Sequence, residues 1–394
     1  GVDALGADTQ GSRAVAVGMN ALLRQNFTTA TNNYNVGVGF SAGDHITTGV
    51  RNILVGGLAG DAFTDADDNV GIGDEALSSD TLGSRSVAVG ANALATQNFT
   101  TATNTFNVAV GYNAGVLVTT GVHNILVGNE SGDALTDADF NVAVGSQTLS
   151  SDTLGSRSVA IGHGALFDQN FTTATDAYNI AVGYLAGANI TTGIQNTLIG
   201  GLAGEDLTDA DANVAFGYQS LRDDTLGSFS VALGAKALKF QNFTTATNAY
   251  NTAVGHSAGL KVTTGTENTL IGGLAGDALT AAYFNTAIGY NTLTTDTLGR
   301  RSIAIGHSAL QNQNFTTATN ADNVAIGYDA GNDITTGISN TFVGSLAGDA
   351  AQTNSFSTLV GAATDCNDTS SNNCNGFGYG IAAVSGCLHH SQWP

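Results

Sequence analysis

Short apolar segments recur along the chain, and each is entered through a polar residue and closed by a glycine. The segment from Asn107 to Gly111, which encloses Val-Ala-Val, is one example. A version of it returns twenty times, with closing glycines at 18, 39, 56, 73, 90, 111, 128, 145, 162, 183, 200, 217, 234, 255, 272, 289, 306, 327, 344 and 361. The intervals of 21, 17, 17 and 17 residues repeat, so the period is 72 residues. A strict period with this many copies predicts a solenoid, in which each turn buries apolar side chains against its neighbours.

The apolar segments are too short for helices, are rich in β-branched residues and are interrupted by glycine, so they predict strands. We therefore expect an all-β chain that forms a parallel β-solenoid, a β-roll or β-helix, of about twenty turns in five blocks. The blocks begin near Gly11, Gly83, Gly155, Gly227 and Gly299. Residues 1–361 are expected to form one elongated repeat domain, and residues 362–394 an irregular cap that contains the cysteines.

Alternation along each strand assigns its side chains to two faces. The residue before the closing glycine is always large and apolar, as in Val17 and Ile161, and we expect this face to fill the coil. The residue two before the glycine is Ala or Gly in three turns of four and larger in the fourth, as in Leu126 and Phe342. Strands that are apolar on both faces are normally covered on both sides, so we expect a second chain to cover the Ala/Leu face. The polar residue before the strand, usually Asn, is expected to form a hydrogen-bonded ladder.

Charge narrows the class of partner. The 394 residues carry a formal net charge of −21 with only 11 Lys and Arg, so nucleic acids and anionic membrane surfaces are poor partners.

No apolar run reaches the roughly 18 residues of a membrane-spanning helix. An acidic chain rich in Gly, Thr and Asn suits an extracellular or saline setting. Gly1 has the phase of Gly73 and no initiator Met or signal peptide precedes it, so we interpret the chain as a processed product or an excerpt of a longer fibre.

The strand motif resembles that of a known family. Residues 107–114 read Asn-Val-Ala-Val-Gly-Tyr-Asn-Ala, and residues 157–163 read Arg-Ser-Val-Ala-Ile-Gly-His. Both resemble the Asn-Ser-Val-Ala-Ile-Gly-x-x-Ser repeat of YadA-like trimeric autotransporter adhesin heads, to which repeats of phage and other viral fibres are similar. The resemblance covers residues 11–361 and implies a left-handed parallel β-roll, a tight homotrimer and a role in adhesion. Turns of 17 or 21 residues are longer than is typical of that family, so longer corners are expected here.

The 21-residue turn always carries the same insert, Gln-Asn-Phe-Thr-Thr-Ala-Thr, first at residues 25–31. We expect it to form a ridge. Each copy contains an Asn-Phe-Thr sequon, which accepts an N-glycan in a eukaryotic-type secretory route. The candidate glycosylation sites are Asn26, Asn98, Asn170, Asn242 and Asn314. The alternative is an Asn/Thr-rich turn kept by duplication, with its Phe packed as a local plug.

A second recurrent turn carries closely spaced carboxylates. Asp133, Asp137 and Asp139 stand in one copy and are candidate Ca²⁺ ligands, since carboxylate oxygens bind this ion. The fourth copy lacks two of the three carboxylates and the fifth retains only Asp349, which favours ordinary Asp turns without a metal.

All three cysteines, Cys366, Cys374 and Cys387, lie in the last 29 residues. Two of them can close a short loop in an oxidising compartment, which leaves one thiol. Cys366 and Cys374 are the candidate pair.

Catalytic motifs are not found. The histidines occupy different phases of the repeat, and no Cys/His metal spacing, nucleophile elbow or phosphate loop stands out, so we expect neither an enzyme nor a cofactor. A carboxylate pair assembled between chains, as in a polysaccharide-cleaving tailspike, is one lesser alternative. Recurrent threonines such as Thr119, Thr136 and Thr153 raise an ice-binding solenoid as another, although ordinary ladder stacking is simpler.

These patterns predict an extracellular structural fibre or adhesin shaft, at a cell or virion surface, that presents repeated loops for attachment. Its partners would be copies of itself, as a homotrimer or an end-to-end filament, and a cell-surface glycan or protein receptor. The alternative is a self-assembling filament or surface-layer subunit without a receptor.

Overall fold

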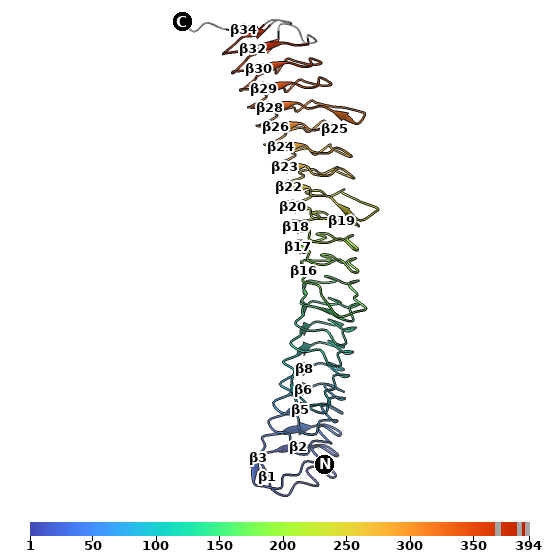
Figure 1. Cartoon of the computed structure of the whole chain (residues 1–394). Coiled ribbons are helices and arrows are strands. Elements are labelled where there is room, and N and C mark those ends of the chain that lie inside the picture. Colours follow the sequence, from blue (N-terminus) through green and yellow to red (C-terminus); the bar gives the residue numbers. More distant parts are fainter. Residues whose placement is uncertain (367–371, 384–387, 391–394) are drawn as a thin grey trace. The chain divides into compact units, whose positions relative to one another are not determined.

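The computed structural model describes residues 1–366, 372–383 and 388–390, and over these residues the chain is all-β without a helix. It comprises two units, Gly1–Gln195 (unit 1) and Asn196–Pro394 (unit 2). Each unit is a parallel β-solenoid, and the strands, about 17 residues apart, give about 22 turns in the two units together (Figure 1). The sequence prediction of a parallel β-solenoid is confirmed.

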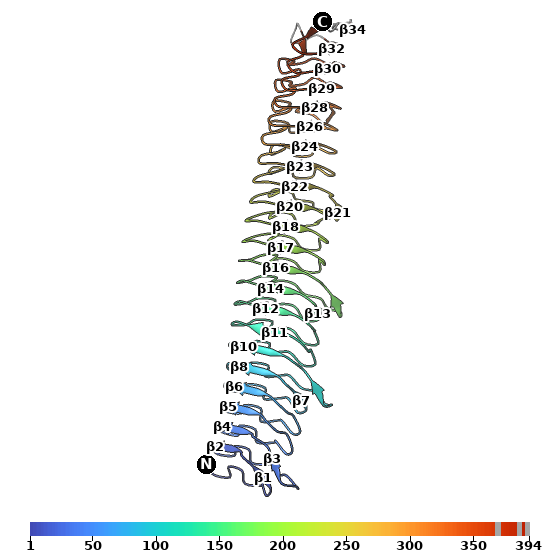
Figure 2. The same ribbon diagram turned by 90° about the vertical axis from the view of Figure 1, so that its left-hand side faces the viewer.

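In unit 1 each turn contributes one three-residue strand to a main sheet (Figure 2). These strands are β2 (Val15–Val17), β4 (Val36–Val38), β5 (Ile53–Val55), β6 (Val70–Ile72), β8 (Val87–Val89), β10 (Val108–Val110), β11 (Ile125–Val127), β12 (Val142–Val144), β14 (Val159–Ile161) and β16 (Ile180–Val182). They pair in parallel and without a register shift. For example, Ala109 aligns with Ala88 on one side and with Leu126 on the other.

Unit 2 has a main sheet of the same kind. Its strands are β17 (Thr197–Ile199), β18 (Val214–Phe216), β20 (Val231–Leu233), β22 (Thr252–Val254), β23 (Thr269–Ile271), β24 (Thr286–Ile288), β26 (Ile303–Ile305), β28 (Val324–Ile326), β29 (Thr341–Val343), β30 (Thr358–Val360), β32 (Asn375–Phe377) and β34 (Leu388–His390). Stacking therefore continues past Gly361, because β32 pairs with β30 and β34 pairs with β32.

Short two-stranded pairs stand beside the main sheets. They are β1 (Gly11–Ser12) with β3 (Thr31–Asn32), β7 (Gly83–Ser84) with β9 (Thr103–Asn104), β13 (Gly155–Ser156) with β15 (Thr175–Asp176), β19 (Gly227–Ser228) with β21 (Thr247–Asn248), β25 (Gly299–Arg300) with β27 (Thr319–Asn320), and β31 (Asp365–Cys366) with β33 (Ala382–Ala383). The first five arise at the 21-residue turns, and in Figure 1 the β19 and β25 loops project from the stacked turns of unit 2.

The two faces of the main-sheet strands are opposite to the sequence prediction. The middle residue of each strand from β2 to β32 points into the coil, and Ala109 and Leu126 are fully buried. The first and third residues, which we call the outer face, point outward, and Val17 and Phe216 are each 56% exposed. The prediction that the residue before the glycine fills the coil was wrong, and so was the prediction that a second chain covers the Ala/Leu face, because that face lies inside the coil.

The physical reason is the volume that the corners place inside the coil. Where the fourth residue after the closing glycine is Leu, as at Leu94, that side chain is fully buried and leaves room only for Ala in the strand. In each block two consecutive turns have Gly there, and the large strand residue of the second turn fills the space beside both glycines. A Cβ atom on Gly115 would lie 2.6 Å from Leu126 Cδ1, and one on Gly132 would lie 2.7 Å from Leu126 Cδ2. Large and small residues thus alternate between corner and strand, and the interior stays close-packed.

The predicted asparagine ladder is confirmed. The backbone amide of Asn124 donates to Asn107 Oδ1 at 2.9 Å, and that of Asn141 donates to Asn124 Oδ1 at 3.0 Å. The Asn124 side-chain amide donates to the carbonyl of Ala138 at 2.7 Å. Each buried Asn therefore joins its own turn to its neighbours and satisfies backbone groups that the interior would otherwise leave unpaired.

We expect Leu126→Ala to lower the free energy of unfolding by about 2–5 kcal/mol, because the truncation leaves a cavity beside two corner glycines. Leu117→Ala is the matched control, since it makes the same truncation in the same turn at a side chain that is 48% exposed. It should cost less than about 1 kcal/mol. Unfolding followed by circular dichroism measures both, and equal losses would contradict the assignment of the faces.

Candidate functional site

The candidate site consists of the five inserts, three in unit 1 and two in unit 2, which we call the ridge. A buried carboxylate holds each of the last four inserts, whereas Asp8 in the first copy is half-buried and accepts from Gly11 and Gln25. In the second copy, the backbone amides of Gly83 and Phe99 donate to Asp80 Oδ1 at 3.0 and 3.1 Å, and the Gln97 side-chain amide donates to Asp80 Oδ2 at 2.6 Å. The same three contacts recur at Asp152, Asp224 and Asp296. Asp80 is fully buried, so the carboxylate joins the insert to the turn below it without contact with solvent.

Gln97 connects this carboxylate to the main sheet. Its side-chain nitrogen also donates to Ser86 Oγ at 3.0 Å, and its oxygen accepts from the Asn107 side-chain amide at 2.8 Å. Ser86 and Asn107 are the buried residues that precede β8 and β10. The ridge is therefore coupled to the asparagine ladder by a chain of buried polar groups, all of which have partners.

Burial raises the pKa of Asp80 above its ordinary value, and hydrogen bonds from Gln97 and from backbone amides partly oppose this rise. The pKa values of Asp152, Asp224 and Asp296 are raised for the same reason. Sequence analysis did not single out these aspartates. Their signal was present, because an Asp stands three residues before the glycine that begins each block.

The insert combines a buried anchor with an exposed tip. The Phe of each copy is buried, with exposed fractions of 5–7% at Phe27, Phe99, Phe171, Phe243 and Phe315. The Phe therefore packs as the local plug that was one interpretation of the insert. The tip that follows it, Thr100 to Ala102 in the second copy, is exposed.

The sequon asparagines lie at the surface of the ridge. Asn26, Asn98, Asn170 and Asn242 are exposed, and Asn314 is half-buried. Each side-chain oxygen accepts a hydrogen bond from a Thr hydroxyl, as in Thr81 to Asn98 at 3.1 Å. These contacts use Oδ1 and not the amide nitrogen to which a glycan is attached, so the geometry is compatible with modification.

The structure does not bring the three candidate calcium ligands together. The Thr120 hydroxyl donates to Asp137 Oδ1 at 2.6 Å, and the Val122 amide donates to Asp139 Oδ1 at 2.8 Å. Asp133 is partly buried, and burial raises its pKa. Within the described ranges, no group of three or more His, Cys, Asp or Glu side chains is arranged to hold a metal ion.

The recurrent threonines form ladders. The Thr119 hydroxyl donates to the carbonyl of Thr136 at 3.2 Å, and the Thr136 hydroxyl donates to that of Thr153 at 3.0 Å. Their donor hydrogens are thus used between turns of the chain, as in ordinary strand stacking.

A column of arginine and aromatic side chains runs along unit 1 and was missed by the sequence analysis. Its members are the residues directly before the buried Asn or Ser of successive turns. The rings of Phe106 and His123 stack at 5.1 Å, those of His123 and Phe140 at 4.9 Å, and the Arg157 guanidinium lies 5.1 Å from the Phe140 ring. Stacking and cation–π contacts of this kind need the side chains to be one turn apart, which a 17-residue interval provides.

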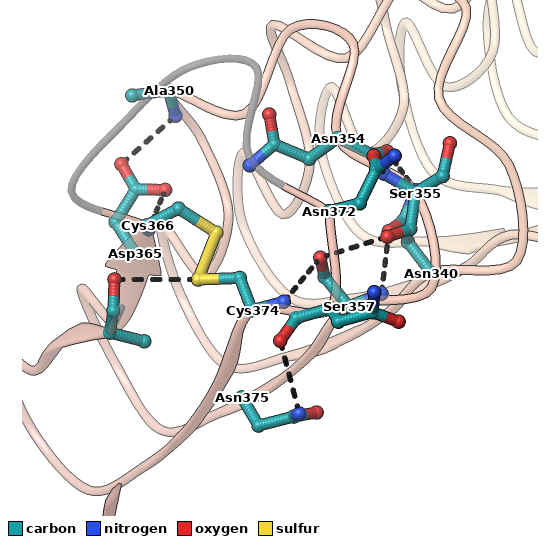
Figure 3. Close-up of a disulfide and its surroundings, with 12 residues drawn as sticks. Asn340, Ala350, Asn354, Ser355, Ser357, Asp365, Cys366, Asn372, Cys374 and Asn375 are labelled. Atoms are coloured by element: carbon teal, nitrogen blue, oxygen red, sulfur yellow. Dashed lines mark hydrogen bonds between the residues drawn. A yellow bond between two sulfur atoms is a disulfide. The ribbon is translucent and has the colours of Figure 1, made fainter. Parts of the chain in front are cut away.

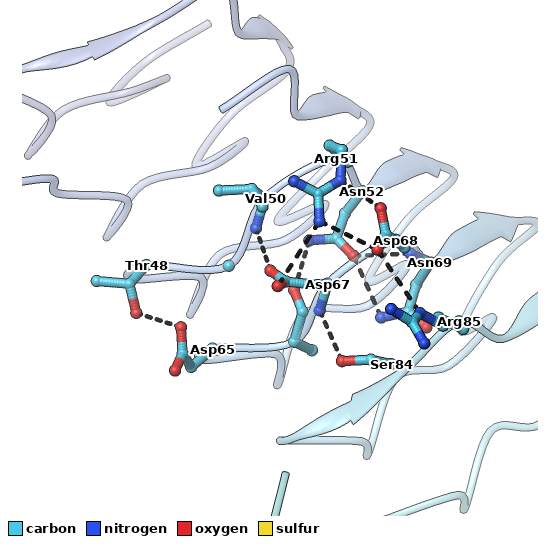
Figure 4. A network of polar contacts seen from close by, with 12 residues as sticks. Thr48, Val50, Arg51, Asn52, Asp65, Asp67, Asp68, Asn69, Ser84 and Arg85 are labelled. Carbon is cyan, nitrogen blue, oxygen red and sulfur yellow. Dashed lines mark hydrogen bonds and ion pairs between the residues drawn. The ribbon is translucent and has the colours of Figure 1, made fainter. Parts of the chain in front are cut away.

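The same column contains ion pairs nearer the N-terminus (Figure 4). Asp68 accepts from the Arg51 guanidinium, and Arg85 Nε lies 3.9 Å from its second oxygen. The Arg51 hydrogen bond lowers the pKa of Asp68 below its ordinary value. All three side chains are partly solvated, so the pairs add little to stability.

Cys366 and Cys374 are joined by a disulfide, with their Cα atoms 6.1 Å apart (Figure 3). This is the pair that the sequence analysis named as the candidate. The amide of Cys374 also donates to Ser357 Oγ at 3.1 Å, which connects the bridge to the turn before it. Cys387 lies outside the described residues.

Comparison with known proteins adds no family. No protein-family model matches the chain, and no curated protein matches it. Among the residues described, there is no helix with the length and apolarity needed to cross a membrane.

The buried carboxylates predict a pH dependence. Because their pKa values are higher in the folded than in the unfolded chain, the stabilisation is fully present below about pH 4 and is lost as the pH rises through the folded-state pKa values. We expect the melting temperature to fall from pH 4 towards pH 8. Asp152→Asn removes one of these titrations but keeps an acceptor for the amides, so its melting temperature should fall less. The exposed Thr173, which does not titrate, supplies the control, Thr173→Ala, which should keep the wild-type slope, and an unchanged slope in Asp152→Asn would contradict the assignment.

We also expect the sequons to accept glycans. When the chain is expressed through a eukaryotic secretory route, mass spectrometry of peptides that contain Asn98 or Asn170 should detect glycan mass. Asn98→Gln should abolish it on the first peptide and leave the second unchanged, with little loss of stability because Asn98 is exposed. Unmodified peptides at both sites would refute the prediction.

Proposed function

We propose that the protein is a non-enzymatic extracellular structural fibre or adhesin shaft, at a cell or virion surface, that presents its five inserts for attachment. The observation that carries the proposal is the repetition of one anchored insert with an exposed Thr-rich tip. Inserts 72 residues apart are separated by four turns, or about 19 Å at a strand spacing of about 4.8 Å. This spacing applies within each unit.

Repetition gives such an array its function. A single Thr- and Asn-rich tip offers only a few hydrogen bonds, and its affinity for a glycan or protein surface would be weak. When one tip of a stiff support is bound, the other tips are held at a high effective concentration near the same surface. The overall avidity of the array therefore greatly exceeds the affinity of a single tip. The buried Asp–Gln–Asn connections support this role, because they limit the motion of the insert and reduce the entropy lost on binding. A left-handed coil and a homotrimer belong to the same proposal and rest on the resemblance of the strand motif.

Attachment can be tested with the full chain on a printed array of bacterial, algal and animal surface polysaccharides. We expect retention on at least one class, and a loss of at least about tenfold when the Thr-Thr pair of all five tips is replaced by Ala-Ala, because multivalent binding falls steeply with the number of contacts. Replacement in a single tip should have a much smaller effect. Thr48→Ala and Thr120→Ala, exposed threonines outside the inserts, are the controls.

Two results would oppose the proposal. Absence of retention on every polysaccharide, together with concentration-dependent polymers in solution, would favour a filament or surface-layer subunit without a receptor. Release of reducing ends from an arrayed polysaccharide would favour a cleaving enzyme.

A further inference from the structure

The outer face of the main sheet is an apolar surface that none of the residues described by the structure covers. In unit 1, the first and third residues of all ten main-sheet strands are Val or Ile. None of these side chains is buried, and Ile53 and Ile125 are each 42% exposed. An antiparallel or parallel sheet with one wet face normally carries polar residues there, so this composition needs an explanation.

Unit 2 shows the same surface in weaker form. The third residue is apolar in every strand from β17 to β32, and Phe216 and Ile326 are 56% and 38% exposed. At the first position, six of the strands from β17 to β32 have Thr, four have Val or Ile, and β32 has Asn. Outward threonines are compatible with water, so unit 1 carries the stronger case.

Charge is absent from this surface. No Asp, Glu, Lys or Arg stands in any main-sheet strand from β2 to β32, although the chain carries a formal net charge of −21. The carboxylates stand in the connecting turns, as at Asp137 and Asp139. The outer face is thus the part of this acidic protein at which two copies can approach without opposing like charges directly, and salt screens the remainder over about 8–10 Å.

We propose that the outer face is the docking surface for a second copy of this chain. Regularity favours that partner over others. Both copies would present rows of β-branched side chains with the same spacing of about 4.8 Å, and two such faces pack at the usual distance of about 10 Å between sheets. The inference rests on the self-association included in the proposed function and assigns a surface to it, but it is independent of whether the ridge attaches to another surface.

The available area is sufficient. Ten strands about 4.8 Å apart and about 10 Å across give an outer face of about 480 Å² in unit 1, and eleven give about 530 Å² in unit 2. Two copies that paired through the outer face of one unit would remove about 1,000 Å² from water, which is at the lower limit for a specific interface. Each outer face matches the largest apolar patch of a typical monomer, about 300–600 Å², and patches of that rank are often functional.

The Arg–aromatic column is next to this surface in sequence, because a single buried Asn or Ser separates each member of the column from the strand that follows it. Phe106 and Tyr178 are 44% and 49% exposed. Aromatic and arginine side chains are enriched in protein interfaces, where they combine a large contact area with polar edges. The column would form one border of the contact.

Sedimentation velocity from 0.1 to 50 µM tests the proposal. We expect the wild-type chain to sediment with a mass that is a multiple of 39.6 kDa, and 1 M NaCl to leave the association intact or strengthen it because the contact is apolar. Ile125→Lys with Val127→Lys places two ammonium groups on the outer face and should weaken association by about 100-fold or more, since neither finds a partner there. Leu117→Lys is the matched control, an exposed Leu in the same turn but outside the strand, and it should associate like wild type. Circular dichroism and the melting temperature at low concentration establish that both variants are folded.

A wild-type chain that stays at 39.6 kDa up to 50 µM would overturn the proposal, and so would assemblies that survive the double Lys variant. Flotation with vesicles of phosphatidylcholine and phosphatidylglycerol distinguishes a lipid surface. A monomeric wild-type chain that floats, and ceases to float after the double substitution, would assign the outer face to lipid instead of a second copy.

Discussion

The whole structure depends on the close approach of consecutive turns at the closing glycine. Gly111 has a φ of +143°, and a Cβ atom there would collide with the carbonyl oxygen of Gly128 in the next turn. Only glycine meets both conditions. With this point fixed in every turn, the strands pair without a register shift, and the asparagine ladder is aligned along each unit. Extra residues are accommodated only where they leave the turn completely, as the inserts do.

Aligned stacking also makes the surface periodic. Residues at equivalent positions of consecutive turns lie one strand spacing apart. This geometry produces the Arg–aromatic column, the outer face of Val and Ile, and the ridge with its tip at every fourth turn. The ridge needs additional anchoring contacts, because an insert of polar residues buries little apolar area against the rest of the turn. The buried Phe and the Asp80-type carboxylate supply it. Three hydrogen bonds offset only part of the desolvation of that carboxylate, and the remainder raises its pKa and causes the pH dependence described above.

Much of this structure could be predicted from the sequence, because the repeat shows the same residue preferences at the same positions many times. The positions of the strands, the role of Asn107 and its equivalents, and the departure of the 21-residue turn follow from period and composition alone. The Asp80-type anchor was legible too but was overlooked, because an Asp near a turn has many ordinary explanations. The Arg–aromatic column is harder to find in the sequence, since its members are 17 or 21 residues apart and are different residue types.

The sequence by itself determined that each strand is apolar on both faces, but it did not determine which face is inside. Alternation along a strand assigns its side chains to two faces, but the same pattern results whichever face points into the coil. The tertiary structure decided which face is inside through the volume available within the coil. Corner residues such as Leu94 already occupy the interior, so Ala fits inside the strand and Val does not, and only at corner glycines is there room for Leu126. The Val and Ile side chains are left outside, where they form the surface that we propose a second copy covers.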